Sequence, residues 1–138
     1  MTQIAAAIAH RNFAALKFGF AVYVLGAVVV HAYIDAGLVW VAAFIFLVLM
    51  LFSYPIAALF REQHERLELA VSAGLLVLGA IGLATTPIFI IAAIALHGAW
   101  DFAKHQGLGI PFFGWYTLGC AAFDWVYAAA LLVFFFNM

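Results

Sequence analysis

The sequence predicts an all-α integral membrane protein, a bundle of five transmembrane helices, and its composition and pattern of apolar runs carry the prediction. Hydrophobic residues make up 70% of the 138 residues, whereas charged residues make up only 8%. A soluble domain carries about 25% charged residues, so this chain has too few charges to cover a surface that faces water. The apolar runs do not alternate with polar residues, which favours helices over the strands of a membrane barrel.

Five apolar runs give the expected helices in order. A membrane-spanning helix needs about 20 residues, and about 17 to 25 are tolerated. The expected helices cover residues 13–34, 38–60, 67–84, 88–105 and 115–136. The third and fourth reach spanning length when Glu68 and His105 lie at the membrane interface. A chain of this length predicts one membrane domain over residues 1–138.

Turn residues separate the runs. Residues 35–37 (DAG) lie between the first two helices, and residues 84–87 (ATTP) lie between the third and fourth. Pro87 cannot continue the preceding helix and is favoured at a helix start, so a tight hairpin is expected there. Residues 106–114 (QGLGIPFFG) contain three glycines and a proline, which predicts a loop before the last helix.

The basic residues predict the orientation. With five helices, all five fall on one side of the membrane: Arg11, Lys17, Arg61, Arg66 and Lys104. Basic residues are enriched on the cytoplasmic side, so the N-terminus is expected in the cytoplasm and the C-terminus outside. The net charge of −1 argues against nucleic acid as a partner, since nucleic acid requires a basic face.

Polar residues in the last two helices predict a site. His97, Asp101 and His105 are spaced i, i+4 and i+8, so they share one face of the fourth helix. At 1.5 Å per residue, His97 and Asp124 both lie roughly 12 Å from the inner ends of their helices. The two helices are therefore expected to form a hairpin in which His97 faces Asp124. An unpaired carboxylate at that depth costs at least about 2.5 kcal/mol, so these groups need partners.

Two interpretations of this cluster are open. As a functional site, His97 and Asp101 would be metal ligands together with His105, or a base and its orienting carboxylate, and Asp124 would be the facing acid or base. Imidazole and carboxylate suit a divalent metal, either zinc or iron. As a structural cluster, the same groups would only satisfy one another inside the bundle.

Other polar positions give weaker indications. His31 and Asp35 repeat the i, i+4 spacing near the outer end of the first helix and are interpreted as structural or interfacial. The charge-balanced segment 61–68 is interpreted as a solvated inner loop. Residues 53–55 (SYP) predict polar atoms and a kink in the second helix, where they could border the same pocket.

The segment from about residue 97 to 128 resembles a family of small bacterial multi-pass membrane proteins known as a domain of unknown function. That family carries His-x-x-Trp-Asp-x-x-His-His, a loop with proline, and Gly-Cys-Ala-x-x-Asp. The matching residues here are His97, Trp100, Asp101, His105, Pro111, Gly119, Cys120, Ala121 and Asp124. Lys104 replaces the first histidine of the usual pair. The resemblance supports the site residues and implies no reaction.

The sequence leaves three functions open. The leading hypothesis is a small membrane-embedded enzyme, metal-dependent or not, that acts on a lipid or another apolar substrate. The alternatives are a proton-coupled transporter or small-solute carrier, and a non-catalytic subunit that stabilises a larger membrane complex. The expected location is the bacterial cytoplasmic (inner) membrane, with the lipid bilayer and a homo-oligomer or larger complex as partners. The single Cys120 excludes an internal disulfide.

Overall fold

The computed structural model describes the backbone of residues 3–62 and 64–138, and the side chains of residues 14, 16–62 and 64–138. Its internal contacts divide the chain into two compact units, Met1–Ile34 and Asp35–Met138, which are described separately. The described residues form α-helices and one short 3-10 helix, and they contain no strand. The all-helical prediction is therefore confirmed over this part of the chain.

The first unit is the helix α1 (Gln3–Tyr33). It starts at Gln3 rather than at residue 13, where the apolar run was expected to begin. The segment before residue 13 is rich in alanine, which is a strong helix former, and counting apolar spans does not register that preference. Near its end the His31 ring nitrogen Nδ1 lies 2.8 Å from the Ala27 carbonyl oxygen, one turn back.

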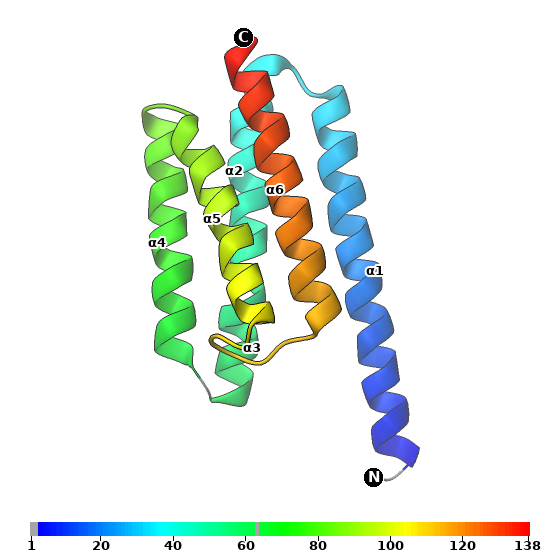
Figure 1. Ribbon diagram of the computed structural model, residues 1–138. Helices are drawn as coiled ribbons and strands as arrows, with labels where there is room; N and C mark the ends of the chain where they lie inside the picture. Colours follow the sequence, from blue (N-terminus) through cyan, green and yellow to red (C-terminus); the bar gives the residue numbers. More distant parts are fainter. Residues whose placement is uncertain (1–2, 63) are drawn as a thin grey trace. The chain divides into compact units, whose positions relative to one another are not determined.

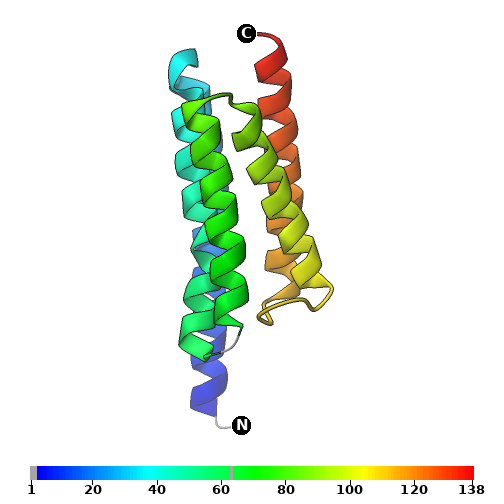
Figure 2. The same ribbon diagram turned by 90° about the vertical axis from the view of Figure 1, so that its left-hand side faces the viewer.

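The second unit contains the remaining helices (Figure 1). In chain order they are η1 (Ala36–Leu38), α2 (Val39–Leu51), α3 (Ser53–Arg61), α4 (Glu65–Ala84), α5 (Ile88–His105) and α6 (Gly114–Phe136). Helix α5 packs between α4 and α6, and α2 packs on α4 and α5. Figures 1 and 2 show that α3 and α5 end where α4 and α6 begin, and this end is called the loop end below.

Four helical segments of the described chain are long and apolar enough to cross a membrane. They are Leu16–Tyr33, Ala36–Arg61, Glu65–Ala84 and Gly114–Phe136. Helix α5 is not among them, because its 18 residues include two histidines, an aspartate and a lysine. The fold thus has the apolar character of a membrane-integral protein.

The second helix is interrupted at Phe52, which divides it into α2 and α3, although Phe52 keeps right-handed helical angles. Pro55 has no backbone N–H, so it cannot bond the carbonyl of Leu51, four residues earlier. The Ser72 hydroxyl of α4 donates a hydrogen bond of 3.2 Å to that carbonyl. Lipid offers no partner for a freed backbone group, so a neighbouring side chain has to provide one. Ser72 therefore makes the break compatible with an apolar environment.

Small residues allow α4 to approach its neighbours closely. A Cβ atom on Gly79 would lie 2.5 Å from the Leu47 side chain of α2, and one on Gly82 would lie 2.6 Å from the Ile90 backbone nitrogen. Glycine at helix contacts is a common device for close packing in membranes. The expected tight hairpin around Pro87 joins α4 to α5, and the close contact of Gly82 with Ile90 lets α5 lie directly on α4.

Candidate functional site

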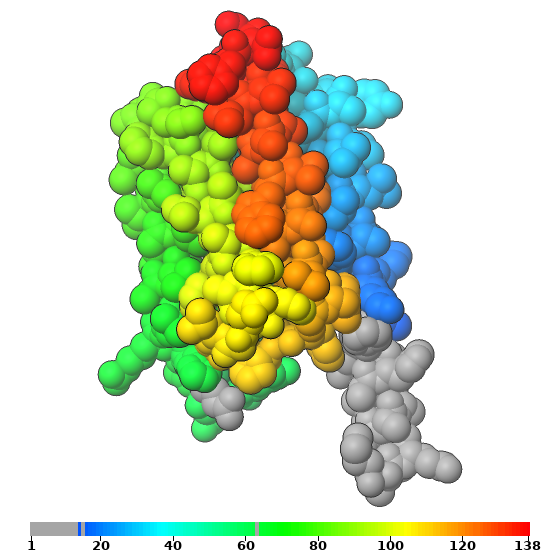
Figure 3. All heavy atoms as spheres, in the orientation of Figure 1, coloured from blue at the N-terminus to red at the C-terminus, as the bar shows by residue number. Residues whose placement is uncertain are grey.

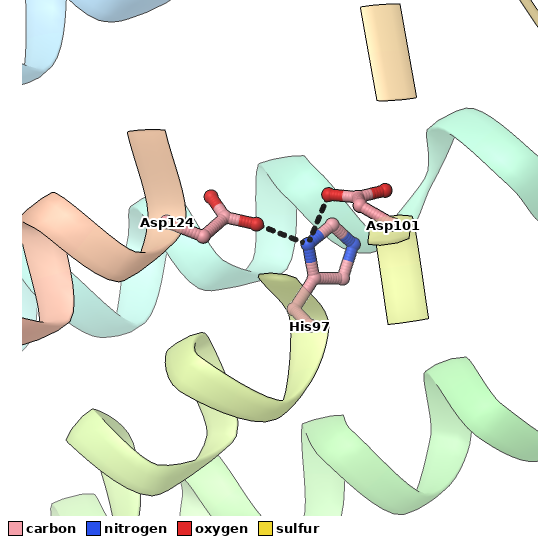
Figure 4. Close-up of side chains that lie close together, drawn as sticks. All are labelled: His97, Asp101 and Asp124. Atoms are coloured by element: carbon pink, nitrogen blue, oxygen red, sulfur yellow. Dashed lines mark hydrogen bonds and ion pairs between the residues drawn. The ribbon is translucent and has the colours of Figure 1, made fainter. Parts of the chain in front are cut away.

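Three ionisable side chains meet in the interior of the second unit (Figure 4). His97 and Asp101 come from α5, one turn apart, and Asp124 comes from α6. The His97 Nδ1 atom lies 2.7 Å from Asp124 Oδ2 and 3.3 Å from Asp101 Oδ2. All three side chains are buried, with exposed fractions of 4%, 0% and 1% for His97, Asp101 and Asp124. The predicted pairing of His97 with Asp124 across the hairpin is confirmed.

Gly98 permits this pairing. A Cβ atom at Gly98 would lie 2.9 Å from the Trp125 ring and 3.1 Å from the Asp124 Cβ atom. Any larger residue would therefore push α6 away from α5 at the level of the cluster. Trp125 covers the same contact from the outside, where its indole N–H donates a 3.2 Å hydrogen bond to the Ala95 carbonyl. The close approach of the two helices brings the Asp124 carboxylate within reach of His97.

Tyr54 of α3 completes the cluster. Its hydroxyl donates a hydrogen bond to Asp101 Oδ1, and the side chain is 3% exposed. The Tyr54 and His97 rings lie nearly parallel, with centroids 6.4 Å apart. Tyr54 was expected only as a residue that borders the pocket, whereas the structure puts it in direct contact with the carboxylate.

The three residues of the cluster could hold a metal ion. One ligand atom from each of His97, Asp101 and Asp124 lies within 4.8 Å of the other two. Among the described residues, Asp101 Oδ2 has no hydrogen-bond partner although it is buried. Its nearest polar contact is the 3.3 Å ion pair with His97 Nδ1, and a cation beside this buried oxygen would stabilise it further. The three groups therefore fit a divalent metal in donor type and in charge.

His105 does not join this cluster. It is exposed at the loop end of α5, and its Nδ1 atom lies 3.4 Å from the Thr117 hydroxyl. It shares a helical face with Asp101, but it lies one turn further toward the loop end. The set of ligand atoms that the fold gathers is therefore His97, Asp101 and Asp124, in place of the expected set of His97, Asp101 and His105.

A second buried cluster lies at the loop end and was not predicted. Glu68 of α4 is 1% exposed and forms an ion pair with Lys104 of α5. The Trp100 indole N–H donates to Glu68 Oε2 over 3.3 Å, and the Ile110 backbone N–H donates to Oε1 over 2.8 Å. Glu68 is therefore a fully bonded interior carboxylate. The prediction of a solvated loop over 61–68 is wrong at this residue.

The segment between α5 and α6 covers this second cluster. Figure 3 shows it (yellow) lying across the loop end of the unit. Gly109 has φ +67, and a Cβ atom there would lie 2.5 Å from Glu68 Oε1, so glycine is required for the backbone to pass so close. Ile110 is fully buried against Tyr54 and Ala58. The guanidinium of Arg61 donates a 2.6 Å hydrogen bond to the Pro111 carbonyl, which fastens the segment to the end of α3.

Lys104 links the two clusters. Its Nζ atom lies 4.3 Å from the centroid of the Tyr54 ring and 5.0 Å from that of Trp100. It thus makes cation–π contacts while it pairs with Glu68. The lysine that stands in place of a histidine in the resembled motif has a specific structural partner in this chain.

Comparisons of the chain with protein-family models, with curated proteins and with solved structures found no match. The resemblance to a family of small bacterial membrane proteins therefore stays a prediction from the motif residues alone.

Proposed function

We propose that the chain is an integral protein of the bacterial cytoplasmic membrane that crosses it five times. The four apolar helical segments provide four crossings, and α5 provides the fifth. Its inclusion is supported by its packing, since His97, Asp101 and Lys104 are all buried against neighbouring helices. Ionisable residues in a membrane-spanning helix face the interior of the bundle in this way.

The proposed orientation has a cytoplasmic N-terminus and an external C-terminus. Arg61, Arg66 and Lys104 all belong to the loop end of the second unit. Arg11 and Lys17 precede the first apolar run in the sequence or lie in its first turns. The excess of basic residues in cytoplasmic loops then assigns the loop end to the cytoplasm.

We further propose that His97, Asp101 and Asp124 form a metal-dependent catalytic centre. The observation that carries this proposal is the convergence of one imidazole and two carboxylates, with the buried Asp101 Oδ2 in contact with His97 but accepting no hydrogen bond among the described residues. As metal ligands the two carboxylates would carry two negative charges, which a divalent cation would balance. Three protein ligands also leave a position for substrate, as catalytic zinc sites do.

Zinc or ferrous iron fits these donors, because both accept imidazole and carboxylate ligands. A divalent metal bound there would act as a Lewis acid on an oxygen atom of the substrate. His97 would hold such a metal through Nδ1, the atom that both carboxylates approach (Figure 4), and Asp101 and Asp124 would supply the other two ligands. The bundle keeps bulk water away, since the three side chains have exposed fractions of 4% or less.

The surroundings favour a lipid or another apolar substrate. An open groove runs between α4 and α5 and is lined by neighbours of the site such as Leu96 and Trp100, although not by the three site residues themselves. These residues belong to helices with apolar outer faces, where an acyl chain is a natural neighbour. A water-soluble substrate would have no need of a centre inside such helices.

A proton-coupled transporter is the second candidate, and the closed surroundings of the cluster favour it. Asp124, His97, Asp101 and Tyr54 form a continuous row of hydrogen bonds or close polar contacts between α6 and α3. This row of polar groups could relay a proton, whereas the burial of all four side chains leaves larger molecules little access to them. In this function the same residues would carry protons without a metal.

Elemental analysis of the purified full-length protein tests the metal centre. The expected result is one zinc or iron per chain, which is lost in His97→Ala and in Asp101→Asn while the helical content stays unchanged. His31→Ala is the matched control, since His31 is a histidine of another helix and contacts the Ala27 carbonyl. A parent protein without stoichiometric metal, whose variants differ from it only in melting temperature, would contradict the proposal. Proton flux into vesicles that depends on His97 would instead support the transporter.

A further inference from the structure

Tyr54 contacts the proposed metal centre through only one of the two oxygens of Asp101. Its hydroxyl donates to Oδ1, whereas Oδ2 of the same carboxylate faces His97 Nδ1 at 3.3 Å. The two oxygens thus have different tasks. Oδ1 accepts a hydrogen bond from Tyr54, and Oδ2 is the oxygen that contacts His97.

The Tyr54 ring is held from several sides, so its hydroxyl has a fixed position. Phe112 contacts the ring edge-on at a centroid distance of 5.3 Å, and Tyr116 does so at 6.5 Å. Lys104 Nζ lies over the ring, and Ile110 packs against it. A side chain held in this manner loses little freedom when it donates a hydrogen bond, and it therefore orients its acceptor effectively.

We propose that Tyr54 is a positioning residue that orients Asp101 for metal binding, an inference that rests on the proposed metal centre. The hydrogen bond at Oδ1 fixes the rotation of the carboxylate about its Cβ–Cγ bond. Oδ2 is then directed toward His97 and Asp124. Without the phenol oxygen, the carboxylate would be free to rotate and to present either oxygen.

Residues that hydrogen-bond a metal ligand typically change metal affinity about 10- to 100-fold when they are replaced. Tyr54→Phe removes one oxygen atom and keeps the ring contacts, so it isolates the effect of the hydrogen bond. Tyr116→Phe is the matched control. It removes a phenol hydroxyl from the same ring cluster, one that lies 3.0 Å from the Ser53 hydroxyl.

The experiment measures the zinc affinity of the full-length protein in lipid nanodiscs by competition with a chelator of known affinity. Tyr54→Phe should bind zinc about 10- to 100-fold more weakly than the parent, whereas Tyr116→Phe should remain within about threefold of it. A merely structural role predicts that both variants lose thermal stability and keep the parent affinity. Equal affinity of Tyr54→Phe and the parent would overturn the inference.

A second variant guards against a folding defect in Tyr54→Phe. Replacing Tyr54 with 4-aminophenylalanine keeps the ring and restores a donor at the same place, so it should return the zinc affinity to within about threefold of the parent. Failure of this rescue would overturn the inference. A parent protein that binds no zinc overturns the metal centre as well. Zinc binding that is insensitive to both changes at Tyr54 overturns only the role of Tyr54.

Discussion

His97 of α5 and Asp124 of α6 are 27 residues apart in the sequence, and their side chains are joined by a contact of 2.7 Å between Nδ1 and Oδ2. The two helices run in opposite directions, so this contact fixes their mutual register (Figure 1). Sliding one helix by one turn would displace its residue by about 5.4 Å along the helix axis and so separate the carboxylate from the imidazole. The contact is therefore both a packing constraint and the centre of the candidate site.

The identity of the third ligand can be tested with a pair of variants. Asp124→Asn should lose bound zinc or iron, because an amide is a poor replacement for a carboxylate at a site with only three protein ligands. His105→Ala should keep the metal, since His105 is exposed and contacts Thr117. Metal analysis of the two purified variants is the measurement. Loss of metal in His105→Ala alone would restore the ligand set expected from the helical spacing.

The buried pair of Glu68 and Lys104 predicts non-additive effects on stability. Glu68→Gln or Lys104→Met alone leaves one charge in the interior without its partner, which should lower the free energy of unfolding by about 3–5 kcal/mol. The double variant removes both charges and should recover most of that loss. Denaturation of the four proteins in one detergent provides the comparison. Losses that simply add in the double variant would show that the two side chains act independently.

Pro55 and Ser72 should also be coupled. Ser72→Ala removes the donor to the Leu51 carbonyl, and hydrogen bonds of this kind between membrane helices contribute about 0.6 kcal/mol on average. In a Pro55→Ala background the new backbone N–H can bond that carbonyl, so Ser72→Ala should then cost less. Unfolding measurements on both single variants and the double variant form the test. An equal cost in the two backgrounds would mean that the proline is not the reason for the Ser72 contact.

The membrane topology predicts opposite locations for the two termini. Reporter fusions at the N-terminus should be active in the cytoplasm, and fusions at the C-terminus should be active outside. An odd number of crossings requires this result, and the basic residues at the loop end determine its sign. Both reporters on the same side would mean that α5 does not cross the membrane.

Counting residues along the helices was sufficient to predict that His97 faces Asp124. The rise per residue of a helix is fixed, and a tight hairpin sets the level of one helix against the next. The hydrogen bond from Tyr54 to Asp101 joins residues 47 apart. It depends on the rotation of α3 after the break at Phe52, which no local pattern specifies. The sequence could therefore indicate that Tyr54 borders the site, but not that it donates a hydrogen bond to Asp101.

The burial of Glu68 was missed for a different reason. It lies in a charge-balanced segment, and such segments are usually solvated. Its main partner, Lys104, is 36 residues away, and Ile110 reaches it only because Gly109 adopts a left-handed conformation. A usable signal was present, because a glutamate and a lysine stand at the loop ends of two adjacent antiparallel helices. Recognising it required the packing of α4 on α5.

The polar character of α5 has a consequence for biogenesis. Within the five-helix proposal, α5 enters the bilayer with the buried Asp101, and a single aspartate at a helix centre costs about 2.5–3.5 kcal/mol in membrane insertion. Asp101, Lys104 and His97 gain their polar partners from three neighbouring helices, which supply Tyr54 (α3), Glu68 (α4) and Asp124 (α6). If α5 crosses the membrane, we expect its insertion to be favoured when it enters the bilayer together with these neighbours rather than alone. The same residues that build the candidate site thus make α5 the helix whose insertion depends most on the completed bundle.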